Sequence, residues 1–109
     1  MTARLPSRLE ATGFMRQAEA VGGFAHVVRK GDPDSGSLLL LIAQRGEAVA
    51  LLERRLGSDF NYNWARFDPP GQDIRSFLSD RMRIDPDIWL IELDVPDAER
   101  FIAETTTLG

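Results

Sequence analysis

Hydrophobic residues recur along this chain first with a helical and then with an extended spacing. In the N-terminal region apolar side chains return every three to four positions, which predicts a helix over residues 7–21. Ser7 and Glu10 have the spacing of a capping box, which would mark the start of this helix. Gly22-Gly23 supplies a left-handed stop after it. We therefore expect the chain to open with one amphipathic helix.

Extended segments with short links follow this helix. The predicted strands comprise residues 24–30, 37–44, 47–54, 60–67 and 88–93. A second helix is expected over about residues 72–83, and a third, capped by Asp94, after the last strand. The short links between the first four strands favour an antiparallel meander. The predicted fold is a single α+β domain over residues 1–109: a mainly antiparallel five-stranded sheet (the four-strand meander plus the fifth strand) with three helices, in the order α-β-β-β-β-α-β-α.

Three of the predicted strands are apolar on both faces, so the middle of the sheet needs cover on both sides. A five-stranded sheet is roughly 24 Å wide, and a helix with its side chains is about 10 Å across. Each face then needs two or three helices, and the chain offers three in total. We therefore expect one face to keep exposed apolar surface that binds a second copy of the chain or another protein. A strongly twisted sheet that seals itself as a monomer is the alternative.

The composition is typical of a globular domain and excludes every function that needs cysteine. The chain has 109 residues, of which 43% are hydrophobic and 28% charged. Cysteine is absent, which excludes disulfides, thiolate metal sites and cysteine nucleophiles. The longest apolar run, residues 38–43, is far shorter than the roughly 20 residues of a membrane-spanning helix. The N-terminus shows no secretion signal, so we expect a cytoplasmic protein without a membrane partner.

The charge is acidic overall and unevenly distributed. Thirteen basic and 17 acidic residues give a net charge of -4, and residues 55–109 alone, with six basic and 11 acidic residues, carry -5. Phosphate binding needs concentrated lysine and arginine. We therefore expect no nucleic acid as a partner.

The candidate catalytic residues centre on His26, the single histidine of the chain. A histidine beside a carboxylate can act as a general base, and Glu53 and Glu92 are the possible partners if the sheet brings them near. This arrangement would suit a small hydrolase or a metal-assisted enzyme. The competing interpretation is a structural or surface role for His26.

A metal site has little support in the sequence. One histidine without any cysteine rules out the usual zinc cages. The acidic turn over residues 32–36 fails the pattern of a calcium-binding EF-hand, because Ala43 stands where the bidentate glutamate belongs. We expect no metal and no cofactor.

Three aromatic residues alternate along the fourth predicted strand and would share one face: Phe60, Tyr62 and Trp64. Such a row can stack on the bases of single-stranded nucleic acid. No basic groove accompanies it, which favours packing in a core or an interface. These three residues are the candidate binding residues.

Several short motifs are familiar in combination. They are MTARLP at residues 1–6, GGFA at 22–25, KGDPDSG at 30–36, DPDIWLIELD at 85–94 and DAERF at 97–101. Together they resemble a family of short alphaproteobacterial proteins known as domain of unknown function 1491. The resemblance implies a bacterial cytoplasmic protein and carries no activity, ligand or catalytic residue.

The pattern as a whole predicts a non-enzymatic protein-interaction module, a homodimer or a binder of another protein, that uses an apolar face of its sheet. A small enzyme built on His26 with Glu53 or Glu92 is the alternative. The sequence identifies neither the partner nor the biological process.

Overall fold

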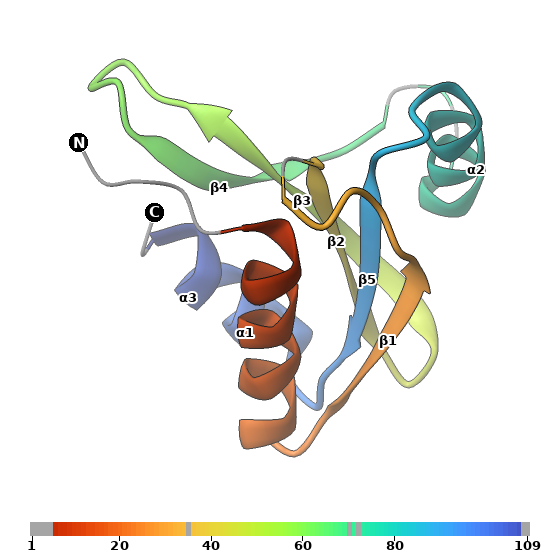
Figure 1. Cartoon of the computed structure of the whole chain (residues 1–109). Helices are drawn as coiled ribbons and strands as arrows, with labels where there is room; N and C mark the ends of the chain where they lie inside the picture. Colours follow the sequence, from red (N-terminus) through yellow and green to blue (C-terminus); the bar gives the residue numbers. More distant parts are fainter. Residues whose placement is uncertain (1–5, 35, 70, 72, 108–109) are drawn as a thin grey trace.

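The computed structural model describes residues 6–34, 36–69, 71 and 73–107. Its elements are α1 (Ser7–Ala20), β1 (Phe24–Arg29), β2 (Leu38–Gln44), β3 (Glu47–Leu56), β4 (Tyr62–Phe67), α2 (Ile74–Ile84), β5 (Trp89–Asp94) and α3 (Ala98–Thr107) (Figure 1). The predicted α+β class, the element order, the five strands and the three helices are confirmed. None of the described helices is long and apolar enough to cross a membrane.

The strand order in the sheet is β1-β5-β2-β3-β4. The predicted four-strand meander is wrong at its first link, because β5 inserts between β1 and β2. The sheet is mixed: β5 runs parallel to β2, and the other three pairings are antiparallel. The reason lies in burial. Strands β2 and β5 carry apolar residues on both faces and take the centre, whereas β1 alternates between exposed and half-buried residues and takes an edge.

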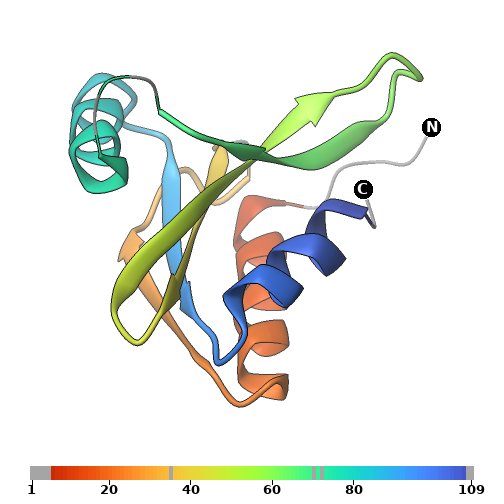
Figure 2. The ribbon, with the colours of Figure 1, turned by 180° about the vertical axis from the view of Figure 1, so that it is seen from behind.

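Helices α1 and α3 lie on one side of the sheet, and α2 lies on the other (Figures 1 and 2). On the first side, Phe14 of α1 and Phe101 of α3 join side chains of β2, β3 and β5 in the larger core cluster. On the second side, Leu78 of α2 packs against a smaller cluster from the same central strands. The sheet therefore has a layer of helix on each face.

Among the residues that the structure describes, the central strands do not keep the exposed apolar face that we expected. Leu39, Leu41, Leu51 and Leu90 face α2 and are each no more than 4% exposed. One helix suffices because polar residues, Glu92 among them, occupy neighbouring positions on this face and leave little apolar area to cover. Elsewhere in the described part of the chain, large apolar side chains that stay at least 40% exposed are Leu9, Val21, Phe24, Val28, Leu56, Phe60, Tyr62 and Ile84.

The capping box predicted at the start of α1 is wrong. The Ser7 hydroxyl makes no cap and instead donates to the carbonyl oxygen of Gly36 at 2.5 Å. The Glu10 carboxylate forms an ion pair with Arg54 of β3. Both side chains thus serve long-range contacts that the local sequence pattern does not reveal.

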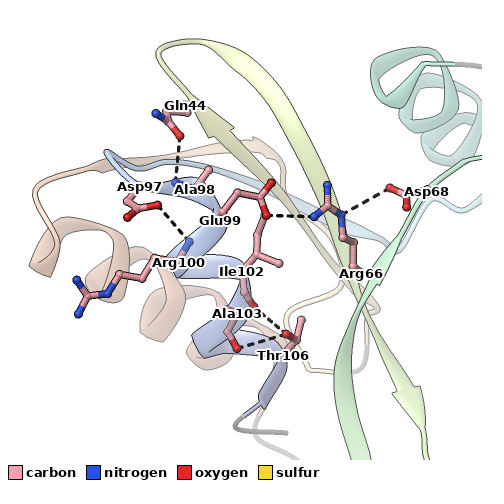
Figure 3. Close-up of polar contacts among 10 residues, drawn as sticks. All are labelled: Gln44, Arg66, Asp68, Asp97, Ala98, Glu99, Arg100, Ile102, Ala103 and Thr106. Atoms are coloured by element: carbon pink, nitrogen blue, oxygen red, sulfur yellow. Dashed lines mark hydrogen bonds and ion pairs between the residues drawn. The ribbon is translucent and has the colours of Figure 1, made fainter.

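Asp94 does not cap α3, contrary to expectation. Its carboxylate accepts from the backbone N–H groups of Arg45 at 3.1 Å and Gly46 at 2.8 Å in the β2–β3 turn. These two turn residues have φ values of 54° and 81°, the left-handed pair of a type I′ hairpin turn. Asp97 caps α3 instead, by accepting from the N–H of Arg100 at 3.2 Å. Figure 3 shows this cap at the start of α3.

Candidate interaction surfaces

The β3–β4 hairpin extends beyond the rest of the sheet. Strand β3 pairs with β2 as far as Glu53, and from Arg54 to Leu56 its described pairing is with β4 alone. Figures 1 and 2 show this part of the hairpin projecting past the end of β2. We call residues 54–64 the arm.

The tip of the arm carries exposed apolar side chains. Leu56, Phe60 and Tyr62 are 55%, 81% and 61% exposed. Leu56 and Tyr62 are register partners, so their side chains lie on the same face of the arm. Water therefore surrounds most of three large side chains at one end of the molecule.

The turn at the tip is held by its own hydrogen bonds. Gly57 N–H donates to the carbonyl of Asn61 at 2.8 Å, and the Asp59 carboxylate accepts from the backbone N–H of Asn61 at 3.1 Å. That N–H, and after it the Asn61 side-chain amide, holds the pKa of Asp59 below its ordinary value. Phe60 has a φ of 64°, a left-handed conformation that costs a non-glycine residue on the order of 1–2 kcal/mol. The local structure presents Phe60 to solvent without any compensating burial.

The base of the arm is anchored to α1. The Trp64 ring packs edge-on against Phe14, with ring centroids 5.0 Å apart, and the Arg54 guanidinium lies 5.2 Å from the Trp64 ring centroid. Arg54 in turn pairs with Glu10. Trp64 is thus part of the core boundary.

The structure separates the three candidate aromatic residues. Tyr62 and Trp64 share a face of β4, as expected, but Phe60 lies in the turn before the strand. Arg66, next on that face, is engaged by Glu99 of α3 at 3.3 Å and by Asp68 at 3.7 Å (Figure 3). Of the expected row, Phe60 and Tyr62 offer accessible rings. Leu56 belongs with them, and the sequence pattern does not indicate it because Leu56 directly precedes the turn residues Gly57-Ser58-Asp59.

The structure brings His26 and Glu92 together and leaves Glu53 apart. His26 on β1 lies opposite Glu92 on β5, and directly opposite residues of an antiparallel pair share a face with Cα atoms roughly 4.5–5.5 Å apart. The Glu92 carboxylate also pairs with Arg75 of α2 at 3.4 Å. Glu53 lies on β3, two strands beyond β5, and pairs with Arg55 at 2.7 Å. His26 itself is exposed.

The described acidic side chains are not arranged for metal binding. Among the residues that the structure describes, no three histidine, aspartate or glutamate side chains gather in a group that could hold an ion. In the acidic turn the Asp32 carboxylate accepts from the N–H of Asp34 at 2.9 Å, and residue 35 lies outside the described residues.

Comparison with known proteins shows the family of this chain. The model of the family described as protein of unknown function (DUF1491) matches residues 5–103. The chain belongs to the DUF1491 family. The resemblance inferred from short motifs is therefore confirmed, and the family description assigns no activity to its members.

Solved structures share the DUF1491 fold. A crystal structure of a DUF1491 family protein from Caulobacter crescentus CB15 is 29% identical, covers 90% of this chain and 94% of that chain, and has a TM-score of 0.76. An NMR structure of a DUF1491 family protein from the same organism is 30% identical over 89% of this chain and 91% of that chain, with a TM-score of 0.70. The solution structure of protein Atu0922 from A. tumefaciens is 24% identical, covers 87% of this chain and 89% of that chain, and has a TM-score of 0.67. No curated protein matches the chain.

Proposed function

We propose that this DUF1491 protein is a non-enzymatic interaction module of the cytoplasm that self-associates through its arm. The observation that carries the proposal is the tip of the arm, where Leu56, Phe60 and Tyr62 are each more than half exposed. Exposed aromatic groups of this kind are enriched in protein interfaces. The left-handed Phe60 adds a backbone cost that a contact with another protein would offset.

A second copy of the chain is the simplest occupant of this surface. Two-fold dimers are the commonest assemblies of soluble proteins, and in such a contact each copy contributes the same patch. Two arms that meet through their tips would remove Leu56, Phe60 and Tyr62 of both copies from water. The gain is roughly 25 cal/mol for each Å² of apolar surface that is buried.

Sedimentation velocity from micromolar to near-millimolar protein tests this proposal. We expect the weight-average mass of the wild type to rise with concentration. The double variant Phe60→Ser/Tyr62→Ser should stay monomeric. The matched control Val21→Ser/Ile84→Ser removes two exposed apolar side chains away from the arm and should associate like the wild type. A wild type that is monomeric throughout, or an arm variant that associates unchanged, would overturn self-association through the arm.

A small hydrolase is the second candidate function, and the cross-strand pair of His26 and Glu92 supports it. In this mechanism His26 is the general base and Glu92 orients its imidazole. The test is hydrolysis of an activated ester such as p-nitrophenyl acetate. His26→Gln should abolish the turnover, and Glu92→Gln should lower it. Equal rates for His26→Gln and the wild type would exclude this activity.

A further inference from the structure

An open groove lies between the first half of α1 and the second half of β1. Its volume is about 580 Å³, and its apolar lining includes Met15 of α1, Val27 of β1 and Trp89 of β5. Figure 1 shows α1 and β1 diverging from the turn that joins them. Most residues that line the groove lie away from this turn, where the two elements are far apart. Because β1 is an edge strand, the groove lies beside a free edge of the sheet.

Two cations mark the wide end of this groove. Arg8 stands in the first turn of α1, and Lys30, the single lysine of the chain, follows β1. The backbone N–H of Arg8 donates to Pro33 at 3.1 Å, which ties this end of α1 to the loop after β1. In the described part of the chain neither cation has an ion-pair partner, and no carboxylate lines the groove. The charged residues that line the groove are therefore both cations, in a protein of net charge -4.

The outer edge of β1 is free to pair. Within the described residues β1 is paired with β5 alone, and no further backbone hydrogen bond involves Phe24–Arg29. The register with β5 is regular from Phe24 to Val27 and shifts only after that. A regular edge of this kind presents unpaired N–H and C=O groups to which an extended chain can add.

We propose that the α1–β1 groove binds an extended acidic segment of a partner protein by strand addition to β1. Backbone hydrogen bonds to the groups of Phe24–Val27 that point away from β5 would hold the segment, and apolar side chains at its Val27 end would enter the groove beside Met15 and Val27. Acidic side chains at one end of the segment would pair with Arg8 and Lys30. Charge complementarity selects this occupant, since the charged residues that line the groove are cations.

Binding of a defined peptide tests the proposal. The probe is a fluorescein-labelled octapeptide, Glu-Glu-Val-Thr-Val-Ser-Val-Ser, and its twin carries two lysines in place of the glutamates. We expect the acidic peptide to bind at least about tenfold more tightly than its twin, as measured by fluorescence anisotropy. In ¹⁵N-labelled protein the amides of Phe24–Val27 should shift, and those that point away from β5 should become protected from hydrogen exchange. The double variant Arg8→Glu/Lys30→Glu should reverse the preference between the two peptides.

Matched variants separate this site from its neighbours. Arg16→Glu/Arg45→Glu makes the same change of net charge at exposed positions that do not line the groove, and it should bind like the wild type. Phe60→Ser/Tyr62→Ser should also bind normally, so the groove and the arm are tested independently. The proposal fails if the acidic peptide does not bind at millimolar concentration, or binds without shifting the β1 amides. It also fails if Arg8→Glu/Lys30→Glu abolishes self-association, because the occupant is then a second copy.

Discussion

The two halves of β3 place leucine in opposite environments. Leu51 and Leu52 are 1% and 0% exposed, whereas Leu56 near the end of the same strand is 55% exposed. Around Leu52 the strand has β2 on one side and β4 on the other, with the helices of the larger core over it. Leu56 lies past the end of β2 and pairs only with Tyr62. A leucine is part of the core here only where neighbouring strands extend far enough to enclose it, and it stays mostly exposed to solvent where they do not.

The largest expected difference is between two truncations on this strand. Leu52→Ala should cost about 2–5 kcal/mol of unfolding free energy, because it leaves a cavity in a fully buried site. Leu56→Ala should cost less than about 0.5 kcal/mol, since its side chain is mostly solvated. Urea unfolding of both variants measures the contrast. Similar losses at the two positions would contradict the division between core and arm.

The next contrast lies between the base and the tip of the arm. Trp64→Ala should cost about 2–3 kcal/mol, below the value for a fully buried ring, because the contacts of Trp64 with Phe14 and Arg54 are lost. Tyr62→Ala removes an exposed ring and should cost less than about 1 kcal/mol. Thermal unfolding compares them, and limited proteolysis should cut the arm faster in the Trp64 variant alone. Faster cleavage in both variants would show that Tyr62 also stabilises the folded conformation of the arm.

Loss of the aspartate that binds the β2–β3 turn and loss of the one that binds the β3–β4 turn should differ less in their effect on the unfolding free energy. Asp94 of β5 binds the β2–β3 turn from outside it, whereas Asp59 binds within its own turn. Asp94→Ala leaves the N–H groups of Arg45 and Gly46 without their acceptor, and we expect a loss of about 1 kcal/mol in denaturant unfolding. Asp59→Ala should cost less stability and should change the amide shifts of Asn61 while leaving those of β2 unchanged. Shifts spreading into β2 would contradict this local role.

The smallest expected effect is a pH dependence at the arm. The Asn61 N–H lowers the folded-state pKa of the Asp59 carboxyl below its unfolded value. The resulting stabilisation is therefore complete above the unfolded pKa and is lost as the pH falls through the folded pKa. Titration of the Asp59 carboxyl by NMR in the folded protein and in a short unfolded peptide of the same sequence measures the shift. An Asp59 pKa at or above its ordinary value would contradict the stabilisation of the ionised carboxyl by the Asn61 N–H.

The sequence predicted the elements well because most of their signals are local. The helical spacing of apolar residues predicted α1, and the short link between two apolar segments predicted the β2–β3 hairpin. Ser7, Glu10 and Asp94 were misassigned because each has a good local partner in the pattern but binds a residue at least 29 positions away in the fold. The estimate of helical cover failed for a related reason. The number of helices needed depends on how many apolar positions face each layer, and only the strand order shows that few of them face α2.

The candidate site was predicted only in part. The alternation in residues 60–67 indicated that Tyr62 and Trp64 share a face, which the register with β3 confirms. The alternation predicted Phe60 to be a strand residue. In the structure Phe60 lies in a left-handed turn before the strand, and this turn depends on hydrogen bonds of Gly57 and Asp59. Nothing in the spacing of Arg8 and Lys30 indicated that they meet at one groove.

By itself the sequence determined the class of fold, the order of the elements along the chain and which strands are apolar on both faces. Hydrophobic period and turn chemistry act over a few residues, so they can be read locally. Only the tertiary structure decided that β5 lies between β1 and β2, that α2 suffices to cover one face, and that β3 extends past β2. These outcomes depend on which distant segments meet and how far each strand extends beside its neighbour. The arm and the groove are consequences of those lengths and pairings.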